Sequence, residues 1–174
     1  MSDVVTAESL RIERADFSDP ALAAFLQAHL DDLAPTAPAE SRHALDLRML
    51  DAPGVRLWVA AHGTAIVGTG ALAAVQTGHE ELKSMRTDPP RRGQGVARRV
   101  LEHLLHDARQ RGVRQLSLET GSHDFFAPAR ALYTTAGFQP CPPFGSYQED
   151  PNSVFMTKHL HPPIPPSGHA ERGC

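Results

Sequence analysis

The stretch Arg91-Arg92-Gly93-Gln94-Gly95-Val96-Ala97 lies between a strand-like segment, residues 81–87, and an amphipathic helical segment, residues 96–111. Its two glycines allow the backbone to turn tightly and to approach a ligand closely. The first turn of the following helix offers unpaired N–H groups and the positive end of the helix dipole. The neighbouring arginines suit the charge and geometry of phosphate. The stretch therefore predicts an anion site that fits a pyrophosphate.

Two other phosphate-binding motifs also place glycines between a strand and a helix. A dinucleotide fingerprint needs a third small residue where this chain has Arg98. A P-loop needs Gly-Lys followed by Ser or Thr, which the stretch lacks. The sequence favours neither motif, and Gly-x-Gly alone also fits an ordinary strand-to-helix connection.

The arrangement from Arg92 to Ala97 resembles the Arg/Gln-x-x-Gly-x-Gly/Ala signature of the GNAT superfamily of acyl-CoA-dependent N-acyltransferases. A second stretch, Ala131-Leu132-Tyr133-Thr134-Thr135-Ala136-Gly137-Phe138, is similar to the family's Leu-Tyr helix followed by Gly-Phe. Residues 81–85 and 118–121 resemble segments of uncharacterised bacterial members. The resemblance covers nearly the whole chain. It implies the GNAT fold, a mixed central β-sheet with a splayed parallel strand pair and flanking helices, and acetyl-CoA as co-substrate.

Composition predicts one domain over residues 1–160 and a proline-rich tail over residues 161–174. The chain has 174 residues and 41% hydrophobic content, enough for one sizeable core. A net charge of −3 with mixed signs gives no basic face for nucleic acid. Ten scattered histidines show no metal-ligand spacing, so no metal is expected. Two cysteines, no export signal and no long apolar run indicate a cytoplasmic protein without a membrane partner.

Hydrophobic periodicity predicts an α/β core. The strand, helix, strand unit around the glycine stretch requires a right-handed crossover and parallel pairing. Strands are expected at residues 10–14, 55–61, 65–75, 80–87, 113–120 and 153–159, and helices at residues 20–33, 39–50, 96–111 and 128–136.

Acyl transfer from a thioester to an amine requires a neutral amine, donors for the developing oxyanion and a proton for the leaving thiolate. The resemblance implies that the backbone of Met85, Arg86 and Thr87 binds the pantetheine and that the Met85 N–H group is the oxyanion donor. Tyr133 matches the family tyrosine that protonates the CoA sulfur. For Met85 and Tyr133 alike, packing in the core is the alternative role.

Two carboxylates are candidates for the general base. Glu81 occupies the strand position where several family members carry a catalytic glutamate, and strand alternation predicts that it shares a face with Met85 and Thr87. A solvated charge at the start of the strand and an ion pair with Lys83 are the alternative roles for Glu81. Glu119 lies on the neighbouring strand and is the competing base.

The resemblance places the acceptor pocket between the first two helices and the last strands. Arg42 and His43 are expected at the start of the helix over residues 39–50, where a guanidinium, a second donor and the helix N-terminus would converge on a carboxylate. Tyr147 is expected to line the same cleft. We therefore expect acetyl transfer to a small, amino-acid-like amine by direct attack in a ternary complex. A non-catalytic CoA-binding module and a protein N-acetyltransferase are the alternatives, and homodimers are common in the family.

One residue departs from the family pattern. Many relatives carry an asparagine seven residues before the motif tyrosine, where it binds the pantetheine arm, whereas this chain has Phe126. Thr120, Ser122 and Asp124 are the candidates to replace that contact.

Overall fold

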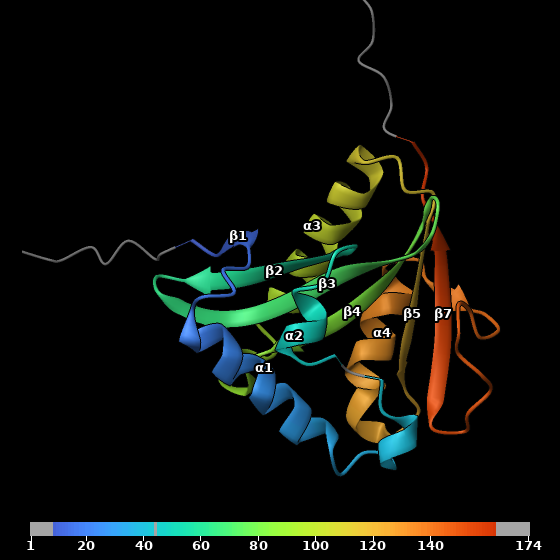
Figure 1. Ribbon diagram of the computed structural model, residues 1–174, viewed down its shortest axis with the longest axis horizontal. Helices are drawn as coiled ribbons and strands as arrows, with labels where there is room; N and C mark the ends of the chain where they lie inside the picture. Colours follow the sequence, from blue (N-terminus) through green and yellow to red (C-terminus); the bar gives the residue numbers. More distant parts are fainter. Residues whose placement is uncertain (1–8, 44, 163–174) are drawn as a thin grey trace, which may run out of the picture.

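The computed structural model describes residues 9–43 and 45–162, which form one seven-stranded mixed sheet (Figure 1). Its strands lie in the order β1-β2-β3-β4-β5-β7-β6. They are β1 (Arg11–Arg14), β2 (Val55–His62), β3 (Ala65–Gln76), β4 (His79–Thr87), β5 (Gln115–Gly121), β6 (Gln139–Pro140) and β7 (Ser153–His159). Within the described residues β4 and β5 pair in parallel and the other neighbours are antiparallel. The predicted α/β class with a parallel pair is confirmed.

Helices cover both faces of the sheet (Figure 1). Helices α1 (Pro20–Leu33) and α2 (Leu47–Leu50) lie on one face, and α3 (Val96–Gln110) and α4 (Ala127–Thr135) lie on the other. Short 3₁₀ turns η1 (Ala39–Ser41), η2 (Pro89–Arg91) and η3 (Asp124–Phe126) connect them. The start of α1 is as predicted, because the Asp19 side chain accepts a hydrogen bond from the Ala21 N–H group and Pro20 opens the helix.

The two faces of the sheet have separate hydrophobic cores. On the α1 side, Leu22 and Leu26 pack with Leu57 and Val59 of β2. On the α3 side, the buried stripe of that helix packs with Trp58 and Ala60 of β2 and with α4. Alternate β2 residues therefore point into different cores, as the period-two geometry of a strand requires.

The parallel pair β4–β5 is splayed. Only residues 79–82 of β4 pair with residues 115–118 of β5, although both strands continue further. Backbone groups of the two strands that face each other beyond this point are therefore outside the ladder. The gap that they leave is where a ligand can meet the edge of the sheet.

A β-bulge in β4 lies directly at the splay. Ser84 and Met85 together lie opposite the single residue Gly70 of β3. Ser84 takes a left-handed conformation with φ 52°. The hydroxyl group of Thr69, which is fully buried, donates a hydrogen bond of 2.8 Å to the Ser84 carbonyl oxygen. This contact holds the bulge in place.

The bulge reverses the alternation of β4. Glu81, Lys83 and Arg86 lie opposite Ala73, Ala71 and Thr69, which share one face of β3. Met85 instead contacts the α3 side, since its sulfur would lie 2.8 Å from a Cβ atom at Gly70. Thr87, opposite Gly68, belongs to that side as well. The prediction that Glu81 shares a face with Met85 and Thr87 is wrong, because the inserted residue shifts the period.

The predicted helix over residues 39–50 is also wrong. The segment contains the three-residue turn η1 and the four-residue helix α2, and Arg42 between them is extended. Asp46 accepts a hydrogen bond from the Met49 N–H group and so starts a new helix. Arg42 and His43 therefore do not lie at a helix start.

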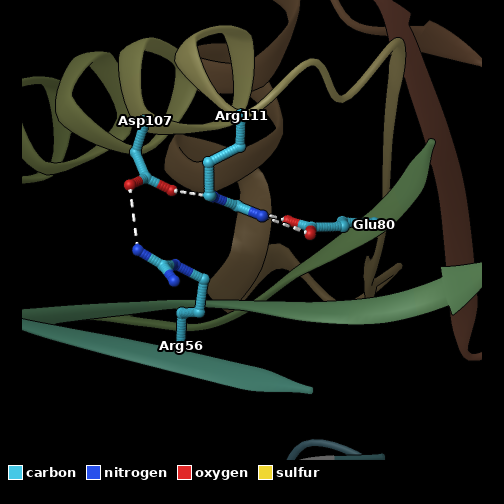
Figure 2. Close-up of polar contacts among 4 residues, drawn as sticks. All are labelled: Arg56, Glu80, Asp107 and Arg111. Atoms are coloured by element: carbon cyan, nitrogen blue, oxygen red, sulfur yellow. Dashed lines mark hydrogen bonds and ion pairs between the residues drawn. The ribbon is translucent and has the colours of Figure 1, made fainter. Parts of the chain in front are cut away.

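An ion-pair network fastens the C-terminal end of α3 to the sheet (Figure 2). Arg111 donates two hydrogen bonds to Glu80 of β4, at 2.6 and 2.7 Å, and one to Asp107 at 2.7 Å. Asp107 also pairs with Arg56 of β2 at 3.3 Å. The network joins α3 to two strands.

The other predicted strands and helices are present with ends shifted by at most two residues, and β6 was not predicted. No helix among the described residues is long and apolar enough to cross a bilayer. The predicted proline-rich tail lies, from residue 163 onward, outside the described residues.

Candidate active site

A cavity of about 120 Å³ opens at the splay of β4 and β5. Its walls come from both strands, from the C-terminal end of α1, from the segment after it and from α4. Six predicted site residues line it together: Arg42, His43, Glu81, Met85, Glu119 and Tyr133. Residues distant in sequence are thus brought to one place by the sheet order.

Glu81 is part of a closed set of three polar contacts. Lys83 Nζ donates to Glu81 Oε1 at 2.8 Å, and the Tyr147 hydroxyl group donates to the same oxygen at 2.5 Å. Lys83 Nζ also donates to the Tyr147 oxygen at 3.0 Å. The side chains of Glu81 and Lys83 are only 12% and 10% exposed. The ion pair considered as one alternative role of Glu81 is therefore present.

Glu119 lies in a different environment on the same cavity wall. Burial raises the pKa of the Glu119 carboxyl group to about 7, against the opposing effect of the nearby Lys83 charge and with a further increase from Glu81. A carboxyl group with a pKa near 7 can accept a proton at neutral pH and give it up again. Of the two candidate bases, Glu119 has the environment that suits proton transfer.

Tyr133 of α4 lies between the core and the cavity. The side chain is buried against Phe138, with ring centroids 5.9 Å apart, and it also lines the cavity. Burial raises the pKa of the Tyr133 hydroxyl group, so the group stays protonated. The hydroxyl group has no hydrogen-bond partner among the described residues and is available to donate to a ligand.

Met85 lies at the boundary between the core and the cavity. Its side chain packs against the α3 core, and the residue also lines the cavity. Because Ser84 and Met85 form the bulge, the backbone at this point departs from the regular ladder with β3. A bulge next to an active site re-aims the groups that it carries.

The predicted phosphate loop follows β4 directly and ends at α3. Gly93 and Gly95 both have positive φ, 75° and 81°, and Gly95 caps the helix in a left-handed conformation. The backbone N–H groups of residues 94–98 donate to no other described residue. Arg92 lies over the Phe125 ring at 5.7 Å. The loop thus presents a row of unused donors and a helix N-terminus.

The Arg86 side chain points away from this loop, toward α1. It pairs with Asp32 at 2.6 Å and lies over the Phe25 ring at 5.3 Å. His29 of α1 lines the cavity, and burial together with the Arg86 charge lowers the pKa of its imidazole to about 4. The α1 wall of the cavity is therefore uncharged at neutral pH.

The segment carrying Arg42 and His43 rests on the loop between β6 and β7. Asn152 donates a hydrogen bond of 3.4 Å to the Ser41 hydroxyl group, and the His43 ring meets the Tyr147 ring edge-on at 4.8 Å. Arg42 forms no ion pair with any described residue. Tyr147 itself lies behind Glu81 and Lys83 rather than on the cavity wall.

Phe126 closes the side of the cavity where the family pattern has asparagine. Its ring packs on Gly121 so tightly that a Cβ atom there would lie 2.2 Å away. Ser122 donates its hydroxyl hydrogen to the Pro151 carbonyl oxygen, and Asp124 is exposed. Of the three candidates for the missing contact, Thr120 is the one that lines the cavity.

The sequence alone does not predict that His29 and Ser84 line the cavity. No pattern in the α1 sequence marks His29, because its position depends on how the helix packs. The bulge at Ser84 carries no glycine, the usual sign of a positive φ. Lys83 was considered only as a surface partner, although its spacing of two from Glu81 predicts a shared face.

Residues 22–138 match the Acetyltransferase (GNAT) family. The chain is 45% identical over 151 residues to the uncharacterised N-acetyltransferase YsnE of Bacillus subtilis (strain 168), covering 87% of this chain and 100% of that protein. It is 43% identical to a protein of Azospirillum brasilense named IAA acetyltransferase, covering 78% and 86% of the two chains. The crystal structure of a protein from Klebsiella pneumoniae, assigned as an acyl-CoA N-acyltransferase, is similar with a TM-score of 0.70 and 34% identity, covering 88% and 99%.

Proposed function

Because the chain belongs to the GNAT acetyltransferase family, we propose that it transfers the acetyl group of acetyl-CoA to the amine of a small acceptor that also carries a carboxylate. The observation that carries the proposal is the meeting of Glu119 and Tyr133 in one cavity at the splay. One group has a pKa of about 7 and the other stays protonated. The cavity thus holds Glu119 as a base for the attacking amine and Tyr133 as an acid for the leaving thiolate.

Acetyl-CoA binding follows from the loop over residues 91–97. The pyrophosphate accepts hydrogen bonds from the free N–H groups at the start of α3, and Arg91, Arg92 and the helix dipole balance its charge. Gln94 supplies an amide, while Gly93, Gly95, Val96 and Ala97 bring the backbone close. The pantetheine arm then enters the splay along Met85, Arg86 and Thr87.

The chemical step is a direct attack on the thioester. The neutral acceptor nitrogen forms a bond to the carbonyl carbon, and the oxyanion accepts a hydrogen bond from the Met85 N–H group. Glu119 takes the proton that the nitrogen loses. When the C–S bond breaks, the Tyr133 hydroxyl group gives a proton to the CoA thiolate. The products are an N-acetyl amide and free CoA, with no covalent enzyme intermediate.

The carboxylate on the acceptor is proposed from Arg42. Arg42 lines the cavity and has no acidic partner among the described residues, so its guanidinium group is suited to bind an anion from solution. His43 stands beside it as a second donor. No helix N-terminus contributes here, since η1 ends at Ser41.

The size of the cavity favours a small acceptor. Pockets for drug-sized ligands begin at roughly 300 Å³, whereas this cavity measures about 120 Å³. A protein substrate could present only its N-terminal residue. We therefore place a free amino acid or a similar carboxylated amine first.

The test is a thiol-release assay with acetyl-CoA and a panel of acceptors at pH 8. The panel pairs amino acids with their decarboxylated amines and adds polyamines, N-terminal peptides and IAA, after which one relative is named. We expect the amino acids to have KM values about 10-fold or more below those of the decarboxylated amines, because one charge-assisted contact is lost. Equal KM values within each pair would remove the carboxylate from the proposal. Turnover of peptides alone would make the protein N-acetyltransferase the better description.

A further inference from the structure

The contacts around Glu81 leave half of its carboxylate free. Both donors, Lys83 Nζ and the Tyr147 hydroxyl group, bind the same oxygen, Oε1. Oε2 accepts no hydrogen bond from any described residue, and Glu81 lines the cavity. The site thus presents one fixed carboxylate oxygen on the same wall as Glu119.

Tyr147 is the residue that completes this arrangement. Its hydroxyl group donates to Glu81 and accepts from Lys83, which a phenylalanine ring cannot do. Its ring contacts His43 at 4.8 Å, Phe144 at 5.1 Å and Phe155 at 5.5 Å. The residue therefore ties the ion pair on β4 to the Arg42–His43 segment and to the loop before β7.

We propose that Tyr147 is a positioning residue for the acceptor: its hydroxyl bridge fixes Glu81 so that Oε2 binds an N–H group of the acceptor nitrogen, while Glu119 takes the proton. The inference rests on the proposed function, because it needs an amine acceptor in this cavity. In this proposal Glu81 binds the acceptor nitrogen and Glu119 deprotonates it.

The geometry favours this division. Glu81 has a cation beside it, 2.8 Å away, and two donors on one oxygen. These contacts suit a carboxylate that is held in one orientation while its other oxygen binds a nitrogen. The charged or titratable groups around the two carboxylates of Glu81 and Glu119 are Lys83 and His79 on β4, Tyr147 and Asp150 on the loop before β7, and Tyr133 on α4.

The test compares Tyr147→Phe with the wild-type enzyme, using the amino acid of the panel that has the highest kcat/KM at pH 8. Removal of the hydroxyl group keeps the ring and its contacts with His43. We expect the acceptor KM to rise about 10-fold, as on loss of one charge-assisted hydrogen bond. We expect kcat to stay within about twofold and the KM of acetyl-CoA to stay unchanged. Calorimetric titration of the acceptor into the enzyme–CoA complex should show the same loss of affinity.

Phe144→Leu is the matched control, because it alters a ring that packs on Tyr147 but leaves the bridge intact. Its acceptor KM should stay within about twofold of wild type. An unchanged acceptor KM in Tyr147→Phe, or a fall in kcat alone, overturns the inference and leaves the proposed function standing. A wild-type enzyme that acetylates none of the amines overturns both. A merely structural tyrosine would lower the melting temperature and weaken both substrates alike.

Discussion

Two glutamates on neighbouring strands differ in this protein only through what surrounds them. Glu81 is ion-paired with Lys83, whereas Glu119 has a pKa of about 7 because it is buried. Enzymes commonly assign acid–base roles by separating the environments of two carboxyl groups in this way. The difference in environment predicts that Glu119 rather than Glu81 is the general base.

We predict that wild-type kcat/KM rises with pH through about 7, because only the ionised Glu119 accepts a proton. Glu119→Gln should lower kcat by about 10²-fold or more and abolish that rise, since glutamine cannot accept the proton. The measurement is a pH–rate profile of the two enzymes with the same acceptor. Glu81→Gln is the comparison: it should raise the acceptor KM but keep the rise near pH 7. If the profile flattens in Glu81→Gln and survives in Glu119→Gln, Glu81 is the base.

The same change has a consequence for stability that does not depend on turnover. The folded pKa of Glu119 lies above its ordinary value of 4.5. The folded state therefore binds more protons between about pH 4.5 and 7, and the free energy of unfolding falls as pH rises through that range. Glutamine carries no charge at any pH, so Glu119→Gln should gain melting temperature over wild type at pH 8 and gain less at pH 5.

At this scale the sequence predicts part of the cavity. Motif register or strand position identifies Glu81, Met85, Glu119 and Tyr133, and all four line it. Arg42 and His43 also line it, although they were expected from a helix start that the structure does not form. The sequence does not predict the burial of Glu119 or the hydrogen bond from Tyr147 to Glu81, because both depend on residues more than twenty positions away along the chain. A single sequence does not specify those contacts.

Among the elements, the loop before α3 is the one that we propose to bind acetyl-CoA. Gly95 caps the helix at φ 81°, and the space around it is open, with the nearest side-chain atom 3.9 Å from a Cβ atom placed there. A substitution can therefore test charge separately from shape. Asn and Asp are nearly isosteric, and both tolerate the left-handed conformation better than other residues.

We predict that Gly95→Asp weakens binding of CoA by about 10²-fold, because its carboxylate faces the pyrophosphate at the helix N-terminus. Gly95→Asn should stay within about 10-fold of wild type, since it adds the same volume without the charge. Calorimetry with CoA measures both variants, and added salt should narrow the gap between them. Equal affinities for the two variants would place the phosphates elsewhere.

The bulge in β4 and the broken second helix mark the limit of sequence patterns for elements. Strand alternation assumes an uninterrupted ladder. The extra residue at Ser84 inverts the alternation, and no glycine in the sequence indicates a bulge there. In residues 39–50 the loop signals on either side, Pro35 to Pro38 and Pro53-Gly54, suggest one helix, but Asp46 starts a separate one and Ser41 is hydrogen-bonded to Asn152. The cap at Asp46 and the distant hydrogen bond from Asn152 outweigh the helix propensity of this segment.

In the part of the molecule that the structure describes, the sheet lies between two separate hydrophobic cores. The cavity proposed for the two substrates lies at the boundary between these cores, since it has one wall from α1 and another from α4. The position of α3 relative to the sheet therefore matters for the phosphate loop at its start. The buried stripe of α3 and the network around Arg111 both fix that position (Figure 2).

We predict that Asp107→Asn lowers the free energy of unfolding by about 1–3 kcal/mol, because the carboxylate accepts from both Arg111 and Arg56, and its loss leaves Arg56 without an ion-pair partner, and Arg111 with Glu80 alone, among the described residues. Urea unfolding at pH 7 measures the change. Glu13→Gln is the control: its pair with Arg11 spans 3.9 Å with both side chains more than half exposed, so the loss should stay below about 0.5 kcal/mol.

Affinity for CoA should be nearly unchanged in Asp107→Asn. Asp107 lies eleven residues along α3 from Val96, or roughly 16 Å at 1.5 Å per residue, so the start of the helix keeps its own packing. If Asp107→Asn instead lost CoA affinity along with stability, the network would also be needed to position the loop over residues 91–97 relative to the sheet. In that case the ion pairs at the C-terminal end of α3 would affect anion binding at its N-terminal end, because the helix moves as one rigid unit.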